Sequence, residues 1–444
     1  MQRLLPLASI VMTSTTVLAQ TFVPMPGISE EPGCNQNICV VSGSGGYSGV
    51  RISDDGQTVV SVVYQPGFID GAIPRFVARW TPGNAPVVIT PELLSLYPAV
   101  GISADGSVVL GDTWRWSAAN GYEDLIPQLR NDQGIWDSLY FGLSDDAQVY
   151  AGIRGIFPDQ GDMFAFQPQN AQRTILPRPA QVPTGYYYFN TISGNGQVLA
   201  GSARQIPSVQ DQFDGYAPVI IRNGLPTLLL PVAQSGFQAV TDLNFDGSVA
   251  VGVFAQGFQI KAFRWTAAGG VQALDEDVPG DSGSSFARAV SRDGSVVVGD
   301  YVQFGTPGTR AWIWQAGVGF RDLQNELEWT YGLGEALSGW KLLVATDISG
   351  DGKSIVGQGR NPDGREQAFF VDLTIPTGCD DIDFNNNNVF PEDQDVIDFF
   401  NVLSGGTCSP GNTCSDIDFN NNGVFPEDDD IIDFFNVLAG GTCS

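Results

Sequence analysis

The sequence predicts an all-β fold, a seven-bladed β-propeller, followed by a small α-helical domain. Two observations predict the propeller: a short S-x-D-G element recurs seven times, and an aromatic segment follows each copy. A third observation separates the second domain, because the chain beyond residue 374 is strongly acidic and carries neither Lys nor Arg. We therefore expect a propeller over 20–374 and a separate domain over 375–444.

The S-x-D-G element sets the length of the repeat. Its copies lie 41 to 58 residues apart, and a small residue follows eight positions after the first residue of each copy. Repeats of this length that contain four short strands are typical of propeller blades. The first residues of the seven copies are Ser53, Ser103, Ser144, Ser193, Asn244, Ser291 and Ser349.

Each repeat is expected to hold one strand before the element, one after it, an aromatic strand and a final apolar strand. Stacking such blades around an axis would bury their aromatic and β-branched faces between neighbours. The last blade lacks an outer strand, which we expect from residues 20–28, and residues 323–342 have helical spacing. The aromatic segments are 76–81, 113–117, 163–167, 218–222, 261–266, 310–315 and 367–373.

The repeated element is interpreted as a hairpin turn. Asp-Gly supplies the positive φ that a tight turn requires, and the Ser side chain can bond to backbone amides of the turn. An Asp-box or a calcium turn is the functional alternative, but seven copies around a ring cannot all line one site. Catalytic carboxylates would have to come from unique loops, and the candidates there are Asp159, Asp162, Asp275, Glu276 and Asp277.

Tyr186, Tyr187 and Tyr188 could stack on sugars or could form an edge strand.

Composition excludes several classes of function. The chain has no histidine, which rules out Ser-His-Asp catalysis and His-ligated zinc or iron. A net charge of −28 is incompatible with binding nucleic acid through its phosphates. Residues 1–19 form a signal peptide, with Arg3 before an apolar run and Ala19 at the expected cleavage point. We expect an extracellular or cell-surface protein without a membrane span.

Six cysteines fit the disulfide chemistry of an exported protein. Two near-identical segments, 379–408 and 414–443, each begin and end with a cysteine. We predict the pairs Cys379–Cys408 and Cys414–Cys443 from this spacing, and Cys34–Cys39 from proximity. Spacing alone does not prove a pairing.

The repeats also resemble a known family. The alternation in KAFRWTAAGGVQAL (261–274) and ARAVSRDGSVVVG (287–299), and the ending at 338–361, resemble the extracellular HAF repeat family. The resemblance covers roughly 40–373. It implies an exported propeller and carries no established shared activity.

The acidic tail contains two copies of a segment rich in oxygen-bearing side chains, DFNNNNVFPEDQD and DFNNNGVFPEDDD. Calcium loops place side-chain oxygens at positions 1, 3 and 5, a backbone carbonyl at 7 and an acid near 12. The pattern therefore predicts two calcium ions. The expected ligands are Asp383, Asn385, Asn387, Val389 and Asp395 in the first copy, and Asp418, Asn420, Asn422, Val424 and Asp430 in the second.

The closing acid has alternatives in both copies. Asp395 and Asp430 are favoured because both copies carry an acid there; Asp393 with Asp428, or Asp429, would replace them. A helix should follow each loop. Val396, Phe399, Phe400 and Leu403 recur at helical spacing and predict one apolar face, which the second copy repeats.

A duplicated loop–helix unit with flanking cysteines resembles the dockerin domain, and the GGTC ending resembles its GC-type form. The resemblance implies docking to a cohesin-like receptor on a scaffold or cell surface. We expect a non-enzymatic binding or structural propeller anchored by this tail. The alternative is a carbohydrate-active propeller, a carboxylate-based glycoside hydrolase displayed through its dockerin, which needs two carboxylates about 5–10 Å apart in the propeller mouth.

Overall fold

The computed structural model contains two compact units, one formed by Phe22–Asp372 and the other including Leu373–Ser444. Each is described by itself. The described residues are 21–26, 50–64, 75–91, 99–129, 138–155, 161–183, 185–205, 215–233, 236–257, 259–275, 283–302, 308–331, 333–373, 379–380, 382–387, 389, 392–421 and 425–439.

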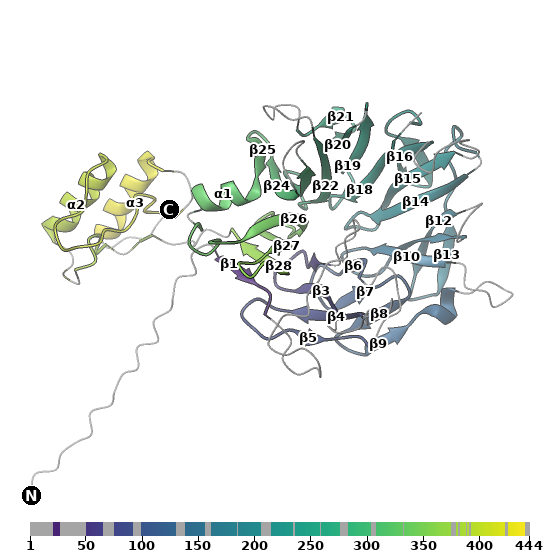
Figure 1. Ribbon diagram of the computed structural model, residues 1–444, viewed down its shortest axis with the longest axis horizontal. Coiled ribbons are helices and arrows are strands. Elements are labelled where there is room, and N and C mark those ends of the chain that lie inside the picture. Colours follow the sequence, from purple (N-terminus) through teal and green to yellow (C-terminus); the bar gives the residue numbers. More distant parts are fainter. Residues whose placement is uncertain are drawn as a thin grey trace, which may run out of the picture. The chain divides into compact units, whose positions relative to one another are not determined.

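The larger unit is a seven-bladed β-propeller, as the repeat count predicts. Seven antiparallel four-stranded sheets follow one another around a ring, coloured from purple in the first blade to green in the seventh (Figure 1). In the first six blades the strand order follows the chain, with the earliest strand innermost. The aromatic segment forms the third strand of every blade, as expected.

The strands of the first three blades are β2 (Arg51–Ile52), β3 (Val59–Tyr64), β4 (Arg75–Trp80) and β5 (Val87–Val88); β6 (Gly101–Ile102), β7 (Val108–Leu110), β8 (Trp114–Ser117) and β9 (Gly121–Asp124); and β10 (Ser138–Leu143), β11 (Tyr150–Arg154), β12 (Asp162–Gln167) and β13 (Gln172–Ile175). Those of the remaining blades are β14 (Gly185–Ile192), β15 (Val198–Gln205), β16 (Tyr216–Arg222) and β17 (Leu225–Leu228); β18 (Ala239–Leu243), β19 (Val249–Gln256), β20 (Gln259–Thr266) and β21 (Gly270–Ala273); β22 (Ser284–Val290), β23 (Val296–Val302), β24 (Thr309–Gln315) and β25 (Gly319–Asp322); and β26 (Lys341–Ile348), β27 (Ser354–Arg360) and β28 (Glu366–Asp372).

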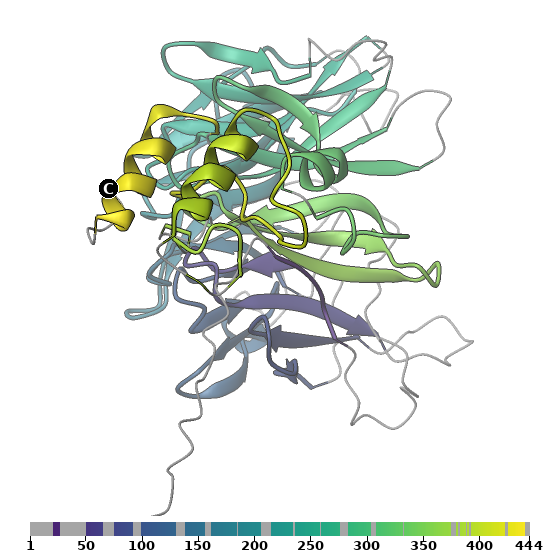
Figure 2. The ribbon, with the colours of Figure 1, turned by 90° about the vertical axis from the view of Figure 1, so that its left-hand side faces the viewer.

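The seventh blade is completed by a strand from the other end of the sequence. Strand β1 (Thr21–Pro24) pairs with β28, giving the order β1-β28-β27-β26. The predicted closing role of residues 20–28 is thereby confirmed. Figure 2 shows this green blade beside the purple strands of the first blade.

The recurrent glycine of the second strand has a packing role. A Cβ at Gly299 would lie 1.9 Å from the carbonyl oxygen of Phe286 and 2.8 Å from the Trp312 ring. Gly252 and Gly357 are confined in the same way by an inner-strand carbonyl and a third-strand aromatic ring. The glycine therefore lets the aromatic side chain lie flat on the sheet, which explains why the two signals recur together.

The hydrophobic core is divided among the contacts between neighbouring blades. Blades one and seven share a cluster that includes Ile52, Trp80, Val356 and Phe370. Equivalent clusters join each neighbouring pair from blades one and two to blades five and six, and large aromatics such as Trp114, Phe164 and Trp312 are fully buried in them. Burial between blades is what favours closing the ring.

The S-x-D-G element is a hairpin turn in all seven copies. The Asp or Asn side chain of each copy accepts a hydrogen bond from the backbone amide two residues later, at 2.8–3.0 Å. The side-chain oxygen of the first residue accepts one from the amide five residues later, at 2.9–3.0 Å. The fourth residue has positive φ, between 54° at Ala147 and 77° at Gly294. The geometric interpretation is confirmed.

Helix α1 (Leu323–Trp329) lies in the insertion before the seventh blade. The Asp322 side chain caps it by accepting a hydrogen bond from the Asn325 amide at 3.0 Å. The helix is shorter than the predicted 323–342, because turns that include Gly339 at a φ of 77° follow it. None of the helices in the described part of the chain has the length and apolar character needed to span a bilayer.

The smaller unit has two helices, α2 (Asp393–Leu403) and α3 (Asp428–Leu438). They pack through Phe399 and Phe434, whose stacked ring centroids are 4.1 Å apart. Phe384 and Phe419, the second residues of the two loops, complete a fully buried aromatic core. The Asp380 amide donates to the Phe419 carbonyl, and the Ser415 amide donates to the Phe384 carbonyl. The duplication in the sequence is thus a duplication in space.

The predicted disulfide pairing in this unit is wrong. Cys408 is bonded to Cys414, so the pairs Cys379–Cys408 and Cys414–Cys443 do not form. A turn at Ser409–Asn412, with Gly411 at a φ of 92°, brings the end of the first repeat to the start of the second. Cys379 is also disulfide-bonded, to a cysteine outside the described residues. The predicted pair Cys34–Cys39 lies outside them too.

Candidate cation loops and propeller channel

The first tail loop gathers the oxygen-bearing side chains that the sequence singles out. The Asn387 amide donates to Asp383 Oδ1 at 3.0 Å and to Asn385 Oδ1 at 3.2 Å. Asn386, between them, has a φ of 54°, which turns the backbone tightly around these oxygens. Asp383, Asn385 and Asn387 therefore lie on one compact turn, and Val389 follows it with an exposed side chain.

Asp395 joins this turn from the first turn of α2. Its Oδ1 accepts a hydrogen bond from the Asn385 amide at 3.4 Å, and its Oδ2 accepts one from the Glu392 amide at 3.3 Å. The second bond is half of a capping box between Glu392 and Asp395. Burial raises the pKa of the Asp395 carboxyl, and the charges of Asp383 and Glu392 raise it further.

The second loop repeats the backbone turn and the capping box of the first. Asn421 has a φ of 53°, and the Glu427 amide donates to Asp430 Oδ2 at 3.1 Å. Burial raises the pKa of Asp430, and the negative charges of Asp418 and Glu427 add to the effect. Asp430 Oδ1 is buried and accepts no hydrogen bond of good geometry among the described residues, although the nearby Asn420 amide lowers the pKa of the carboxyl.

The residues of the first loop fit a hard cation such as Ca²⁺, because carboxylate and amide oxygens converge on one turn. In both loops the closing acid is fully buried and is repelled by neighbouring acids. The alternative closing acids, Asp393, Asp428 and Asp429, are exposed on the helices. The predicted ligands Asn422 and Val424 lie outside the described residues.

Glu392 is a further candidate ligand, which the loop spacing alone does not single out. Its Oε1 accepts a hydrogen bond from Asn387 Nδ2 at 2.5 Å, which places it on the same turn. The E-x-x-D capping-box spacing before each helix is the signal that could have identified it. By contrast, Asp398, Cys408 and Cys414 cluster closely, but the disulfide occupies both sulfur atoms, so this group is not a metal site.

The second candidate region is a cavity of about 160 Å³ in the propeller channel. Two sets of residues supply its charged groups: the x residues of the S-x-D-G turns, and the inner-strand residues two positions before each turn. The turns themselves are joined around the axis by seven backbone hydrogen bonds of 2.8–3.2 Å between neighbouring blades. The x residues are Asp54, Ala104, Asp145, Gly194, Phe245, Arg292 and Gly350; the inner-strand residues are Arg51, Gly101, Gly142, Thr191, Asp242, Ala289 and Asp347.

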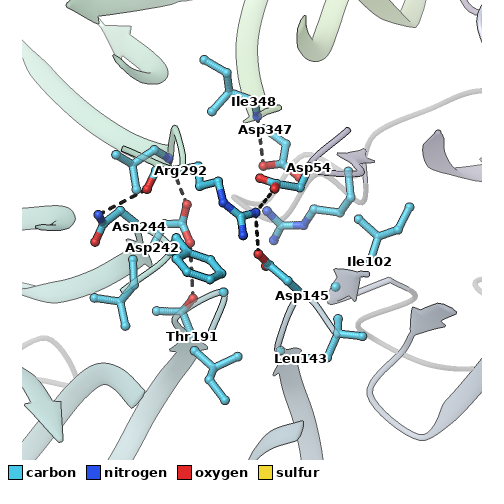
Figure 3. A pocket seen from close by; sticks show the side chains of 18 of the residues that line it. Asp54, Ile102, Leu143, Asp145, Thr191, Asp242, Asn244, Arg292, Asp347 and Ile348 are labelled. Carbon is cyan, nitrogen blue, oxygen red and sulfur yellow. Dashed lines mark hydrogen bonds and ion pairs between the residues drawn. The ribbon is translucent and has the colours of Figure 1, made fainter. Parts of the chain in front are cut away.

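Arg292 crosses the channel at the level of the turns. Its Nη1 binds Asp54 and also Asp145 Oδ2, the latter at 2.9 Å (Figure 3). Its guanidinium lies 3.8 Å from the centre of the Phe245 ring. Burial and the nearby Asp54 raise the pKa of Asp145, against the lowering effect of Arg292. Side chains from four blades thus close one level of the channel together.

Asp242 and Asp347 lie at the level of the inner strands (Figure 3). Asp242 accepts a hydrogen bond from the Val290 amide at 2.9 Å, and Asp347 accepts one from the Ile52 amide at 3.0 Å. Desolvation, followed by repulsion from Asp347, raises the pKa of Asp242 to about 7. Desolvation also raises the pKa of Asp347, and Arg51 lowers it.

The acids on unique loops are engaged in structural contacts where the structure describes them. Asp275 is buried and binds Lys261 Nζ at 3.0 Å and Ser285 Oγ at 2.8 Å. Asp162 binds Arg178 Nη2 at 2.6 Å. Asp159, Glu276 and Asp277 lie outside the described residues. Tyr187 is buried on inner strand β14, and its hydroxyl donates to the Pro177 carbonyl at 2.6 Å.

Neither a protein-family model nor a curated protein sequence matches the chain. Among solved structures, the chain is similar to the β-propeller domain of the Trilobed protease from Pyrococcus furiosus, at 11% identity and a TM-score of 0.47 over 78% of this chain and 98% of that one. It is also similar to a putative TolB from Agrobacterium tumefaciens, at 14% identity and a TM-score of 0.38, covering 65% and 94% of the two chains.

A third similarity is to an acylaminoacyl peptidase from Pyrococcus horikoshii, at 11% identity and a TM-score of 0.46. It covers 74% of this chain and 52% of the peptidase. At these identities and TM-scores the comparisons carry no information about activity.

Proposed function

We propose that this chain is an exported binding or structural propeller, held on a scaffold or cell surface by its calcium-dependent, dockerin-like tail. The observation that carries the proposal is the pair of buried closing acids, Asp395 and Asp430, each set among further acids of its loop. Such carboxylates repel one another when no cation is bound, so calcium should stabilise the tail by binding only its folded form.

Calcium binding can be measured on the intact protein. Titration calorimetry should give two calcium ions bound per chain. Scanning calorimetry should show an unfolding transition of the tail whose midpoint temperature rises with calcium and falls with a chelator. Calcium at a hundred times its Kd would stabilise the tail by about 3 kcal/mol for each of the two sites. The double variant Asp383→Ala, Asp418→Ala should lose this shift, because both loops lose their first ligand.

The matched control is Asp393→Ala with Asp428→Ala. It also removes two negative charges, but from exposed positions on the helices that follow the loops, and it should keep the calcium shift. A tail transition that is the same with calcium and with chelator in the unmodified protein would refute the loop assignment.

An apolar ridge on the two helices supports docking to a protein partner. Phe400 and Phe435 are each 42% exposed, and their ring centroids are 6.0 Å apart. Ile397 and Ile432 flank them, 50% and 51% exposed. Because the two repeats contribute equally, the ridge presents nearly the same surface in two orientations, as the resemblance to dockerins implies. A cohesin-like scaffold receptor fits this surface best.

We predict that Phe400→Ser with Phe435→Ser will release the protein from the outer surface of the producing cells. Calcium titration should be unchanged, because neither side chain lies in a loop. Retention of the variant at the level of the unmodified protein would exclude the ridge as the docking surface. Release of the unmodified protein by a chelator would show that the tail holds it on the cell, and not adhesion through the propeller.

The alternative is a glycoside hydrolase displayed through the same tail. A hydrolase requires two available carboxylates, and of the loop acids that the structure describes, Asp162 and Asp275 are each paired with a basic side chain. Incubating the intact protein with a panel of polysaccharides should give no release of reducing ends. Hydrolysis of any of them would favour the alternative.

A further inference from the structure

The channel cavity contains charges of opposite sign that do not pair with one another. Arg51 forms no ion pair with an acid in the described part of the chain, and its Nε has no hydrogen-bond partner. Asp242 and Asp347 face the same cavity and likewise bind no basic side chain there. This contrasts with Arg292 one level away, which binds two carboxylates.

Structural needs explain part of this arrangement. Asp242 on the fifth blade accepts from the Val290 amide on the sixth, and Asp347 on the seventh accepts from the Ile52 amide on the first. These bonds join neighbouring blades and hold both carboxylates against the wall. An asparagine could accept the same bonds without a desolvated charge. Arg51 lowers the pKa of both carboxyls by its charge, but it forms no ion pair with either of them. The charges therefore need another explanation.

We propose that the channel cavity binds a small zwitterion with the size and charges of a small α-amino acid. The cavity volume, about 160 Å³, is near that of a cavity known to hold a benzene-sized molecule of six heavy atoms. The ligand carboxylate would pair with the free guanidinium of Arg51. Its ammonium would lie between Asp242 and Asp347, where Thr191 adds a hydroxyl.

The neighbouring blades make room for such a ligand. The positions that correspond to Arg51 and the two acids are Gly101, Gly142 and Ala289 on three other blades, so no large side chain from them fills the channel. Arg292, held by Asp54 and Asp145, closes the level of the turns. A ligand would thus enter from the opposite end and meet the charged groups of the first, fifth and seventh blades.

The first experiment uses intact protein in chelator, which keeps the tail loops free of calcium and makes the result independent of the proposed tail function. Titration calorimetry compares glycine, L-alanine and L-serine with propionate and ethylamine, each of which carries only one of the two charges. The zwitterions should bind at least about tenfold more tightly than either analogue, since each charged hydrogen-bonding group contributes at least that much.

Two variants test the residues. Arg51→Gln and Asp242→Asn should each weaken amino acid binding by about tenfold or more, while the exposed controls Arg360→Gln and Asp363→Asn should leave it unchanged. If a variant does not fold, the ligand series on the unmodified protein decides. The proposal is overturned if no amino acid binds at millimolar concentration, or if propionate or ethylamine binds equally well.

Discussion

A single backbone angle defines each blade turn, and six of the seven turns meet it with glycine. The fourth turn residue has positive φ and packs against the neighbouring blade. A Cβ at Gly247, for example, would lie 2.7 Å from Val198, whereas Gly224 has a similar φ of 71° with nothing within 4 Å. Ala147 adopts the same conformation at a φ of 54°. The turn therefore tolerates a side chain only where the neighbouring blade leaves room.

We predict that Gly247→Ala will destabilise the propeller by about 2–4 kcal/mol, the sum of left-handed strain and overpacking. Gly224→Ala, the matched control, should cost about 1–2 kcal/mol, because it carries the strain alone. Urea unfolding followed by tryptophan fluorescence measures both, since all the tryptophans lie before residue 374. Equal losses in the two variants would show that the blade contact contributes nothing.

Asp242 should make propeller stability depend on pH. Its pKa is about 7 in the folded protein and about 4 in an unfolded chain. The folded state therefore binds the proton more tightly, and the free energy of unfolding falls as pH rises from about 4 through 7. Asp347, whose pKa is also raised, acts in the same direction, and Arg51 opposes both.

Asp242→Asn should consequently be more stable than the unmodified protein at pH 8, with a smaller difference at pH 5. The asparagine oxygen can still accept the bond from the Val290 amide. Urea unfolding at the two pH values gives the comparison, with exposed Asp363→Asn as the control. A difference that does not change with pH would mean that the Asp242 carboxyl titrates in its ordinary range.

At the scale of elements, the sequence predicts well the features that recur from blade to blade. The four strands of each blade, the hairpin turn and the closing strand β1 follow from recurring residues with local physical causes. Helix α1 is overestimated because helical spacing continues through the turn that contains Gly339. The cysteine pairing is missed because equal spacing fits bonds between repeats as well as within them, and only the turn after Cys408 decides.

The difference between fixed spacings and variable positions of the repeat also explains which site residues the sequence identifies. A calcium loop requires side-chain oxygens at fixed positions, and this spacing identifies Asp383, Asn385 and Asn387 from the sequence alone. The channel residues Asp242 and Arg292 occupy positions where the repeats differ from one another. A search for repeated residues passes over them, although the x position of each turn is where a propeller can vary its channel without changing its blades.

At the scale of the whole molecule, ring stability depends on strand β1. Phe22 is buried against Trp340 and Phe369, with ring centroids 5.0 and 5.9 Å away. We predict that Phe22→Ala will destabilise the propeller by about 3–5 kcal/mol, as for other buried phenylalanines. Leu225→Ala, on an outer strand and 71% exposed, should change stability by less than about 0.5 kcal/mol. Thermal melting distinguishes the two; a small loss at Phe22 would show that the ring is stable without this contact.

The pairing of β1 with β28 in the seventh blade also sets the order in which the propeller can fold. Strand β1 leaves the ribosome first, but its partner β28 is synthesised some 340 residues later. Until β28 has been synthesised, the seventh sheet cannot be completed. Once it has been synthesised, β28 presents an unpaired strand edge until β1 pairs with it. Six blades can therefore assemble progressively, while closure must wait for nearly the whole propeller, which leaves an open-ring intermediate as the species that is exposed to aggregation and proteolysis.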